Sequence, residues 1–291
     1  MLIVTGASGL LGAKVAALAR DQGHRVTGLY HRNPPNVSGI RAIGLDLTDE
    51  RQLGGVFHEC GAKTVIHCAA ATDVDWCEEH ANLAHEINVR VSAALARLTA
   101  QSGARMVYVS TDAVFDGTRS NYAESDRTGP LNVYARTKLD GESGVLRNNR
   151  DAVVVRVNLY GRSQRQKPSL AEWIMARLAS GDVVPAFTDV IFCPIYAADL
   201  AQLLLEIVDR ELVGLYHAAG SEAVSKFEFA RRMAVAFGFD PKLIVPSCLA
   251  DAKLNTLRPR NTSLNTEKLS TVLGRPMPGV DLGLRKFAGL G

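Results

Sequence analysis

The sequence predicts an α/β protein, in which a doubly wound parallel sheet is joined to a smaller lobe drawn mainly from the C-terminal part of the chain. Two observations support this fold class. Short apolar segments alternate with amphipathic segments through the first half of the chain, and the first apolar segment runs directly into a glycine-rich turn, Gly6–Gly12. Strands this apolar, separated by helices, are typical of a parallel sheet covered on both faces. Ligands of such sheets bind where the strands end.

The glycine turn has the pattern Thr-Gly-x-x-Gly-x-x-Gly, beginning at Thr5. Gly6 lets the chain turn out of the strand, Gly9 lets the backbone approach a phosphate, and Gly12 lets the new helix pack against the sheet. The first amides of that helix form an anion site. A plain strand-to-helix turn is the alternative, but the strand before the glycines and the helix and strand after them favour a dinucleotide (Rossmann) site. The expected cofactor contacts here are Gly6, Ser8, Gly9, Leu10, Leu11 and Gly12.

Composition limits the function classes. The chain has 291 residues, 47% of them hydrophobic, and its net charge of +3 is too small to indicate binding to nucleic acid or a membrane. The first apolar run is a strand rather than a signal peptide, and no apolar segment approaches the length of a membrane span. Five scattered cysteines favour reduced thiols over a zinc site or disulfides. We expect a cytoplasmic monomer or homodimer that binds a small molecule and no metal.

Further apolar and amphipathic segments define the expected elements. Strands are expected at 25–30, 43–45, 64–69, 106–109 and 152–157, and helices at 49–59, 82–101 and 134–147. Residues 1–157 then form the dinucleotide-binding domain, with 197–218 completing it. Residues 158–196 and 219–291 form the substrate-binding lobe, which we expect to close over the cleft.

The C-terminal half has weaker signals. Residues 163–169 are polar and predict a loop. Helices are expected at 170–178, 199–208 and from Ser225 to about Gly238, with strands at 215–218 and 243–245. Ser225 and Glu228 form a capping-box pattern. Asn265 is expected to cap a last short helix that ends at Gly274.

The end of the second strand selects the cofactor. An acidic side chain roughly 20 residues beyond the glycines would hold the ribose 2′-hydroxyl of NAD, but the sequence there is Tyr30-His31-Arg32-Asn33. The guanidinium of Arg32, helped by His31, suits a 2′-phosphate because it offers several fixed donors. The alternative is a solvated Arg at the start of a loop. Because the glycine turn lies upstream, the sequence favours NADPH over NAD.

Two further strand ends belong to the expected cofactor site. Asp46, followed by Leu47, either accepts a hydrogen bond from an adenine amino group or caps the helix that begins near Asp49. The fourth strand closes with Cys68, Ala69 and Ala70, whose small side chains let a flat cofactor lie close to the backbone.

Tyr134 and Lys138 lie four residues apart, on one face of the predicted helix. A phenol with a pKa of roughly 10 is a poor proton donor near neutrality, but a neighbouring ammonium lowers that pKa, so the pair can act as general acid and base. A surface helix would also explain the spacing. Ser110 and Thr111, directly after the fifth strand, favour the catalytic interpretation because they place hydroxyls where a substrate carbonyl would be held.

With these residues assembled, the chain resembles an extended short-chain dehydrogenase/reductase, and within that superfamily the dTDP-4-dehydrorhamnose reductase family. The resemblance spans nearly the whole chain in collinear order. The matching segments are 5–12, 46–49, 68–75, 87–89, 110–117, the pair Tyr134 and Lys138, and 258–264.

The resemblance implies a role for each matching residue. Tyr134 protonates the keto oxygen as hydride arrives from the nicotinamide, and Lys138 lowers the Tyr134 pKa and binds the nicotinamide ribose. Thr111, with Ser110 or Asp112, hydrogen-bonds the carbonyl or the phenol. Asn88 positions the cofactor side of the cleft. The implied substrate contacts are Asp73, Asp112, Tyr134, Asn158 and Arg258. Arg258 is a candidate for binding the diphosphate of a nucleoside-diphosphate sugar, and the alternative is that this Arg, which precedes a Pro, anchors a loop.

Three departures from the family pattern lie in the expected substrate region. Ala113 stands where the rhamnose enzymes typically have Tyr, 156–161 lacks the Trp often found there, and 189–195 replaces a Gly-x-Pro-Thr-like segment. They leave the sugar open. A second function class is a non-catalytic NADP-binding regulatory subunit resembling the methionine adenosyltransferase beta subunit, and a third is a reductase or epimerase of another substrate.

Overall fold

The computed structural model describes residues 1–163, 168–252 and 254–290, and the chain divides into two compact units. Unit 1 comprises Met1–Thr111, Asn132–Arg156 and Ala201–Tyr216. Unit 2 comprises Asp112–Leu131, Val157–Leu200 and His217–Gly291. The largest difference from the expected domains is that 112–131 groups with unit 2, although the expected dinucleotide domain runs unbroken to residue 157. Residues 157, 197–200 and 217–218 also group with unit 2.

Unit 1 is built on a seven-stranded sheet in the order β11-β6-β5-β4-β1-β2-β3. Strand β1 is paired in parallel with β2 on one side and β4 on the other. The chain therefore winds outward in both directions from β1, as the sequence predicts. The strands are β1 (Leu2–Thr5), β2 (Val26–Tyr30), β3 (Arg41–Gly44), β4 (Thr64–His67), β5 (Arg105–Thr111), β6 (Val153–Val157) and β11 (Gly214–His217).

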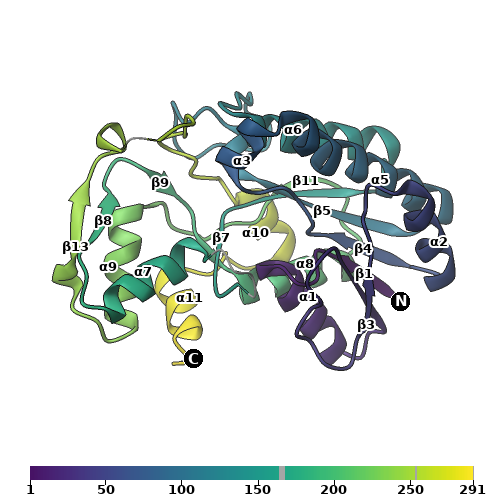
Figure 1. Cartoon of the computed structure of the whole chain (residues 1–291), viewed down its shortest axis with the longest axis horizontal. Coiled ribbons are helices and arrows are strands. Elements are labelled where there is room, and N and C mark those ends of the chain that lie inside the picture. The colour runs from purple at the N-terminus through teal and green to yellow at the C-terminus, as the bar shows by residue number, and fades with distance from the viewer. Residues whose placement is uncertain (164–167, 253, 291) are drawn as a thin grey trace. The chain divides into compact units, whose positions relative to one another are not determined.

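Helices cover both faces of this sheet (Figure 1), with α5 and α6 on one face and α1 on the other. The apolar core beneath α5 and α6 includes Ile3, Val65, Leu95, Met106 and Val154, each at most 2% exposed. The helices of this part of the chain are α1 (Leu10–Asp21), α2 (Glu50–Cys60), α3 (Val74–Glu79), α4 (Ala81–His85), α5 (Val91–Ser102), α6 (Val133–Asn148) and α8 (Ala197–Asp209).

Unit 2 consists of short strand pairs and helices around an aromatic core. Tyr160 and Phe192 both contact the ring of Phe229 edge-on. The strand pairs are β7 (Leu159–Tyr160) with β10 (Ile195–Tyr196), β9 (Ile191–Phe192) with β12 (Val224–Ser225), and β8 (Val184–Phe187) with β13 (Ile244–Ser247). Its helices are α7 (Leu170–Ala179), α9 (Lys226–Ala236), α10 (Glu267–Leu273) and α11 (Val280–Phe287).

The structure differs from the predicted elements in a few places. The single helix expected over 82–101 is α4, a π-helical turn at Glu86–Arg90 and α5 in succession. The expectation that the helix ending at Gly274 is the last one is wrong, since α11 follows it. No helix is expected from the sequence at α3 or α11, because helices this short have too few turns to show a clear apolar periodicity in the sequence. Of the loop expected at 163–169, residues 164–167 lie outside the described ranges.

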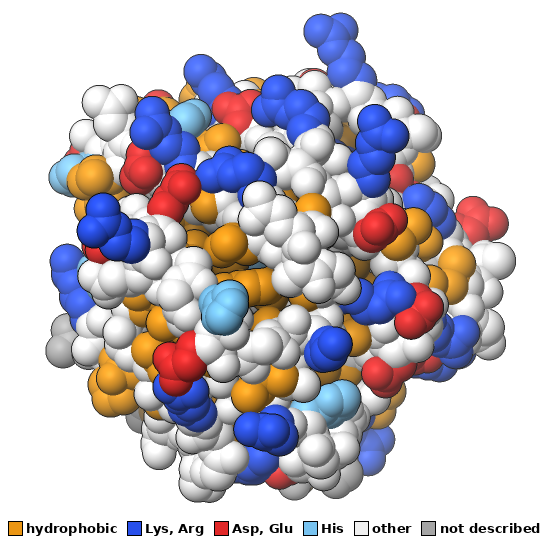
Figure 2. Space-filling view, turned by 90° about the vertical axis from the view of Figure 1, so that its right-hand side faces the viewer, with side chains coloured by type: hydrophobic (Ala, Val, Ile, Leu, Met, Phe, Trp, Pro, Cys, Tyr) orange, Lys and Arg blue, Asp and Glu red, His pale blue; other side chains and the backbone are white. Residues whose placement is uncertain are grey.

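Charged side chains are mixed on the face of the molecule that Figure 2 shows, where blue and red groups lie interspersed. The 33 basic and 30 acidic residues nearly balance, so no continuous basic patch covers this face. Among the described residues, no helix has the length and apolar character needed to span a membrane.

A pair of glycine substitutions tests the packing of α6 against the sheet. A Cβ at Gly141 would lie 2.4 Å from the Tyr108 hydroxyl oxygen and 2.5 Å from the Asn88 carbonyl oxygen. We expect Gly141→Ala to lower the free energy of unfolding by about 1–3 kcal/mol because α6 must shift. Gly55, in α2, has nothing within 4 Å of such a Cβ. Gly55→Ala is expected to stabilise the protein by about 0.5–1 kcal/mol. Urea unfolding measures both, and equal effects would contradict the packing.

Candidate active site

The glycine turn brings three backbone segments of unit 1 into close contact. Gly6 has φ +65°, and a Cβ on it would lie 2.9 Å from the Cα of Ala69. A Cβ on Gly12 would lie 2.2 Å from the Gly6 carbonyl oxygen. Only glycine fits either position. Gly9 caps α1, whose first amides have no acceptor within the helix. The turn and the close packing are those that the sequence predicts.

A buried chain of hydrogen bonds fixes the ends of β1 and β4 beside this turn. Thr5 Oγ1 lies 2.6 Å from His67 Nδ1 and accepts from the Ala69 amide, and His67 Nε2 lies 3.1 Å from Ser92 Oγ. Because the Ser92 hydroxyl donates to the Asn88 carbonyl oxygen, His67 Nε2 must carry the proton and Thr5 must donate to Nδ1. Burial, with a smaller effect of Lys138, lowers the pKa of His67 to about 3, so this ring is neutral.

Asn88 lies in the π-helical turn and is 1% exposed. Its side-chain amide donates to the Ala71 carbonyl oxygen and the Thr137 hydroxyl, and its oxygen accepts from the Ala71 amide. Thr137 in turn donates to the Tyr134 carbonyl oxygen. Asn88 therefore ties the segment after β4 to the first turn of α6. π-Helical turns of this kind are frequent at functional sites.

Tyr134 and Lys138 lie on consecutive turns of α6, which Asn132 caps by accepting from the Ala135 amide. The Lys138 side chain is 2% exposed, donates to the Val109 carbonyl oxygen at 2.8 Å, and lies 4.0 Å above the centre of the Tyr108 ring. Burial lowers the pKa of Lys138 to about 7, although Glu142 and Cys68 act in the opposite direction. The structure thus holds a buried ammonium one turn from a half-buried phenol.

Two charged residues that sequence analysis missed lie beneath this pair. Glu142 continues the face of Tyr134 and Lys138 by one more turn, and it accepts three hydrogen bonds from Arg156 and one from Ser110. Both members of the Glu142–Arg156 ion pair are about 5% exposed or less. The i, i+4, i+8 spacing was the available signal. Thr111 follows Ser110 as the last residue of β5 and is 6% exposed.

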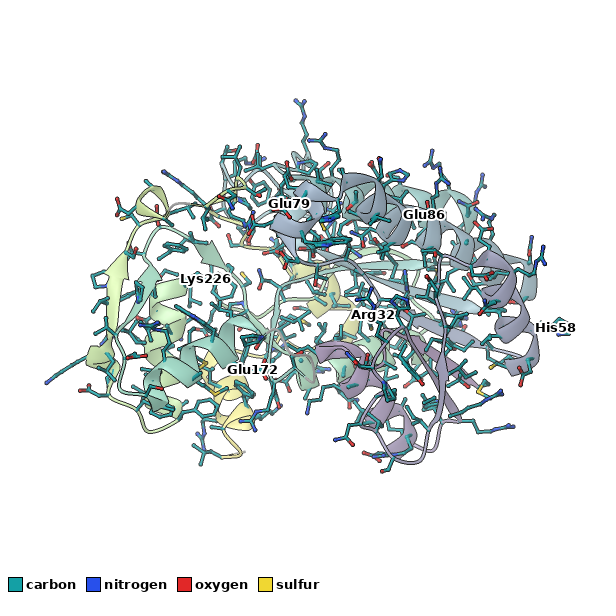
Figure 3. The ribbon with its side chains drawn as sticks, viewed as in Figure 1. Arg32, His58, Glu79, Glu86, Glu172 and Lys226 are labelled. Carbon is teal, nitrogen blue, oxygen red and sulfur yellow. The ribbon has the colours of Figure 1, made fainter. Side chains whose placement is uncertain are left out.

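The residues expected at the adenosine end lie at the ends of β2 and β3. Arg32 is exposed beyond the end of β2 (Figure 3). His31 Nε2 lies 3.8 Å from Asp46 Oδ2. The other carboxylate oxygen of Asp46 accepts from the amide and hydroxyl of Thr48, which lowers the pKa of Asp46. The helix-capping interpretation of Asp46 is wrong, because Asp49 caps α2.

The apolar residues and the cysteine expected beside the cofactor are partly or fully buried in unit 1. Cys68 and Ala70 are half-buried directly after β4, and burial raises the pKa of the Cys68 thiol to about 12. Leu47 packs against the apolar core, and Leu11 is buried in the first turn of α1.

The expected substrate residues are divided between the units. In unit 1, Asp73 caps α3 by accepting from the Trp76 amide at 3.3 Å. In unit 2, Asp112 Oδ2 accepts from Asn158 at 2.6 Å and from Thr262. The guanidinium of Arg258 donates to the Thr256 carbonyl oxygen at 3.2 Å. The structure thus joins Asp112 to Asn158 directly and gives Asp73 a local structural contact.

Lys226 of unit 2 is a further cation that sequence analysis did not single out. It is the first residue of α9, and its ammonium lies 3.3 Å from the centre of the Phe192 ring. All five cysteines are free thiols. In the described part of the chain, no three His, Cys, Asp or Glu side chains form a group that would hold a metal ion.

Comparison with known proteins gives matches along nearly the whole chain. The family model described as RmlD substrate binding domain matches residues 1–288. A probable low-salt glycan biosynthesis reductase, Agl14, from Haloferax volcanii is 34% identical over 282 residues, covering 96% of this chain and 94% of its own. The methionine adenosyltransferase 2 subunit beta of Xenopus laevis is 33% identical over 289 residues, covering 95% of this chain and 84% of its own.

Solved structures share the fold. A dTDP-4-dehydrorhamnose reductase from Bacillus anthracis, solved in complex with NADP, superposes with a TM-score of 0.84 at 27% identity, covering 98% of this chain and 97% of its own. The similarity therefore extends through both units and is not limited to unit 1.

The burial of Lys138 predicts a pH dependence of stability. The pKa of Lys138 is about 7 in the folded protein, whereas the ordinary value of a lysine is 10.5. Between pH 7 and 10.5 the unfolded chain therefore binds more protons at this residue than the folded protein does. The free energy of unfolding therefore rises with pH in this window, by at most about 1.4 kcal/mol per pH unit, and becomes independent of this group well below pH 7, where both states are fully protonated. We expect Lys138→Met to remove that rise, as measured by urea unfolding from pH 7 to 9.5. Exposed Lys14→Met should retain it, and an unchanged slope in Lys138→Met would contradict the prediction.

Proposed function

Because the chain belongs to the RmlD substrate binding domain family and has the fold of an extended short-chain dehydrogenase/reductase, we propose that it is an NADPH-dependent reductase of a keto group on a nucleotide-activated sugar. One observation carries the proposal. The buried Lys138 lies one turn of α6 from Tyr134. Its ammonium contacts the Tyr108 ring and the Val109 carbonyl oxygen of β5.

The residues of unit 1 fit a dinucleotide. Gly6 and Gly12 have no room for a Cβ because the backbone of Ala69 and of Gly6 itself packs against them, which gives the tight strand-to-helix turn of a dinucleotide site. The first amides of α1 supply donors and the positive end of a helix dipole. Arg32 would bind the 2′-phosphate of NADPH, with His31 beside it, and Asp46 would accept from the adenine. A dTDP-4-dehydrorhamnose reductase that binds NADP shares this fold.

Bound NADPH would supply the hydride for reduction. Hydride addition builds negative charge on the keto oxygen, and the side chains that aim donors at that oxygen lower the barrier. Tyr134 Oη gives its proton to the oxygen, and Thr111 Oγ1 donates a hydrogen bond to it. Lys138 stabilises the resulting phenolate, because a buried ammonium attracts a nearby anion more strongly than an exposed one does.

Buried neighbours hold these groups in place. Asn88 fixes the first turn of α6 through Thr137. The Glu142–Arg156 pair, by binding the Ser110 hydroxyl, fixes the strand end that carries Thr111. Unit 2 would serve as the substrate-binding lobe, with Asp112 and Asn158 as contacts for sugar hydroxyls and Arg258 as a further contact, while Asp73 would contribute from unit 1.

A regulatory subunit is the second candidate, favoured by the 33% identity to a methionine adenosyltransferase 2 subunit beta. NADPH oxidation measured on dTDP-, GDP- and UDP-linked 4-keto sugars separates the two candidates. Turnover on any of these substrates supports the reductase. Tight NADPH binding without turnover on the whole panel would support the regulatory role.

Removal of one hydroxyl tests the proton donor. We expect Tyr134→Phe to lower kcat by about 10²–10⁴-fold, the usual contribution of general acid catalysis, while the NADPH Kd stays within twofold. Steady-state kinetics and fluorescence titration of NADPH measure the two effects. Undiminished turnover would rule out Tyr134 as the donor.

The cofactor preference is tested at the end of β2. Arg32→Ala should raise the Kd of NADPH by at least tenfold, because it removes charge-assisted hydrogen bonds to the 2′-phosphate, and should leave NADH nearly unchanged. Arg51→Ala, an equally exposed arginine of unit 1, is the matched control. Equal losses for NADPH and NADH would contradict the phosphate role of Arg32.

A further inference from the structure

Lys226 is a lysine of unit 2 that Figure 3 labels. Its backbone amide donates to the Val190 carbonyl oxygen, and its ammonium lies over the face of Phe192 at 3.3 Å from the ring centre. No hydrogen-bond acceptor for that ammonium is present among the residues that the structure describes. A lysine ammonium carries three donors, so this group retains its capacity to bind an anion.

The position is unfavourable for a cation in the absence of a ligand. Lys226 is the first residue of α9, where the positive end of the helix dipole repels a positive charge. Burial lowers the pKa of Lys226 to about 8, although the Asp112 carboxylate acts in the opposite direction. Helix formation does not require a lysine here, since Ser225 already caps α9 by accepting from the Glu228 amide. The local energetics therefore point to a role in binding.

The surroundings of Lys226 suit an anion that also carries hydroxyl groups. Asp112, the carboxylate that raises the Lys226 pKa, is 4% exposed and is held by Asn158 and Thr262. Asn158 and Thr262 thus hold the Asp112 carboxylate in place as an acceptor for a ligand hydroxyl. The Phe192 ring covers one side of the ammonium, so an anion would approach from another side with less competition from water.

We propose that Lys226 binds the diphosphate of the nucleotide-activated substrate. The inference rests on the proposed function, because it takes the substrate class from it. Charge-assisted hydrogen bonds from a partly buried ammonium to phosphate oxygens are stronger than those of an exposed lysine. The bound diphosphate would also offset the dipole and burial effects that disfavour this cation in the free protein.

Binding of free nucleoside diphosphates tests the inference without any reduction step. Isothermal titration calorimetry with dTDP, UDP and GDP identifies the nucleotide that the unaltered chain binds. For that nucleotide we expect Lys226→Met to raise the Kd by at least tenfold and Lys226→Arg to keep it within threefold. Lys242→Met, which removes an exposed lysine of the same unit, should leave the Kd unchanged. The corresponding nucleoside should bind the unaltered chain and Lys226→Met equally.

A measurement of stability separates binding from a structural role. Since Lys226 is disfavoured in the free protein, Lys226→Met should keep or raise the thermal unfolding midpoint and keep the NADPH Kd. A lowered midpoint together with weakened NADPH binding would make Lys226 a structural counter-ion of Asp112 and overturn the inference. An unchanged dTDP, UDP or GDP Kd in Lys226→Met overturns it too, as does the absence of nucleoside diphosphate binding by the unaltered chain.

The Lys226 site and the reductase proposal can fail separately, and the measurements distinguish the two failures. Loss of nucleoside diphosphate binding in Lys226→Met, with no turnover of any keto sugar by the unaltered chain, would uphold the Lys226 site and reject the reductase. Turnover by Lys226→Met with an unchanged substrate KM would uphold the reductase and reject the site.

Discussion

The close approach of three backbone segments at Gly6 is the constraint on which the junction of β1, β4 and α1 in unit 1 depends. The turn after β1 touches the segment after β4 at Ala69, and the first turn of α1 touches the Gly6 carbonyl oxygen through Gly12. No side chain separates them, so β1, β4 and α1 meet at one edge of the sheet. The hydrogen bonds of Thr5 and His67 then fix this junction from inside.

The polar groups buried behind that edge form a connected set. Asn88 links the β4 end to α6, and Ser92 links Asn88 to His67. The charges of Glu142 and Arg156 compensate each other. A buried ion pair of this kind contributes little to stability by itself but strongly disfavours loss of one partner. The Glu142–Arg156 pair holds α6, β5 and β6 in one arrangement, because Glu142 of α6 accepts hydrogen bonds from Ser110 of β5 and Arg156 of β6.

Much of the fold of unit 1 and several features of its site were predictable from local patterns. The apolar strand at Leu2–Thr5, the spacing of Gly6 and Gly12, and the separation of Tyr134 from Lys138 are each expressed within a few residues. Local patterns were less reliable where tertiary contacts decide the role of a residue. Asp46 was open to two interpretations, and the structure excludes helix capping because Asp49 occupies the cap. Lys226 went unnoticed because a lysine at the start of a helix has no distinctive pattern.

The sequence alone determined the alternation of strands and helices, the glycine turn, the Tyr134–Lys138 pair and the family resemblance, because each depends on residues close together in the chain. Only the tertiary structure decided which distant side chains meet. It joined Asp112 to Asn158 and Thr262, closed the His67 hydrogen bonds, and removed Lys138 and Lys226 far enough from water to lower both pKa values. Burial and long-range contact are properties of the packed chain, and no local pattern encodes them.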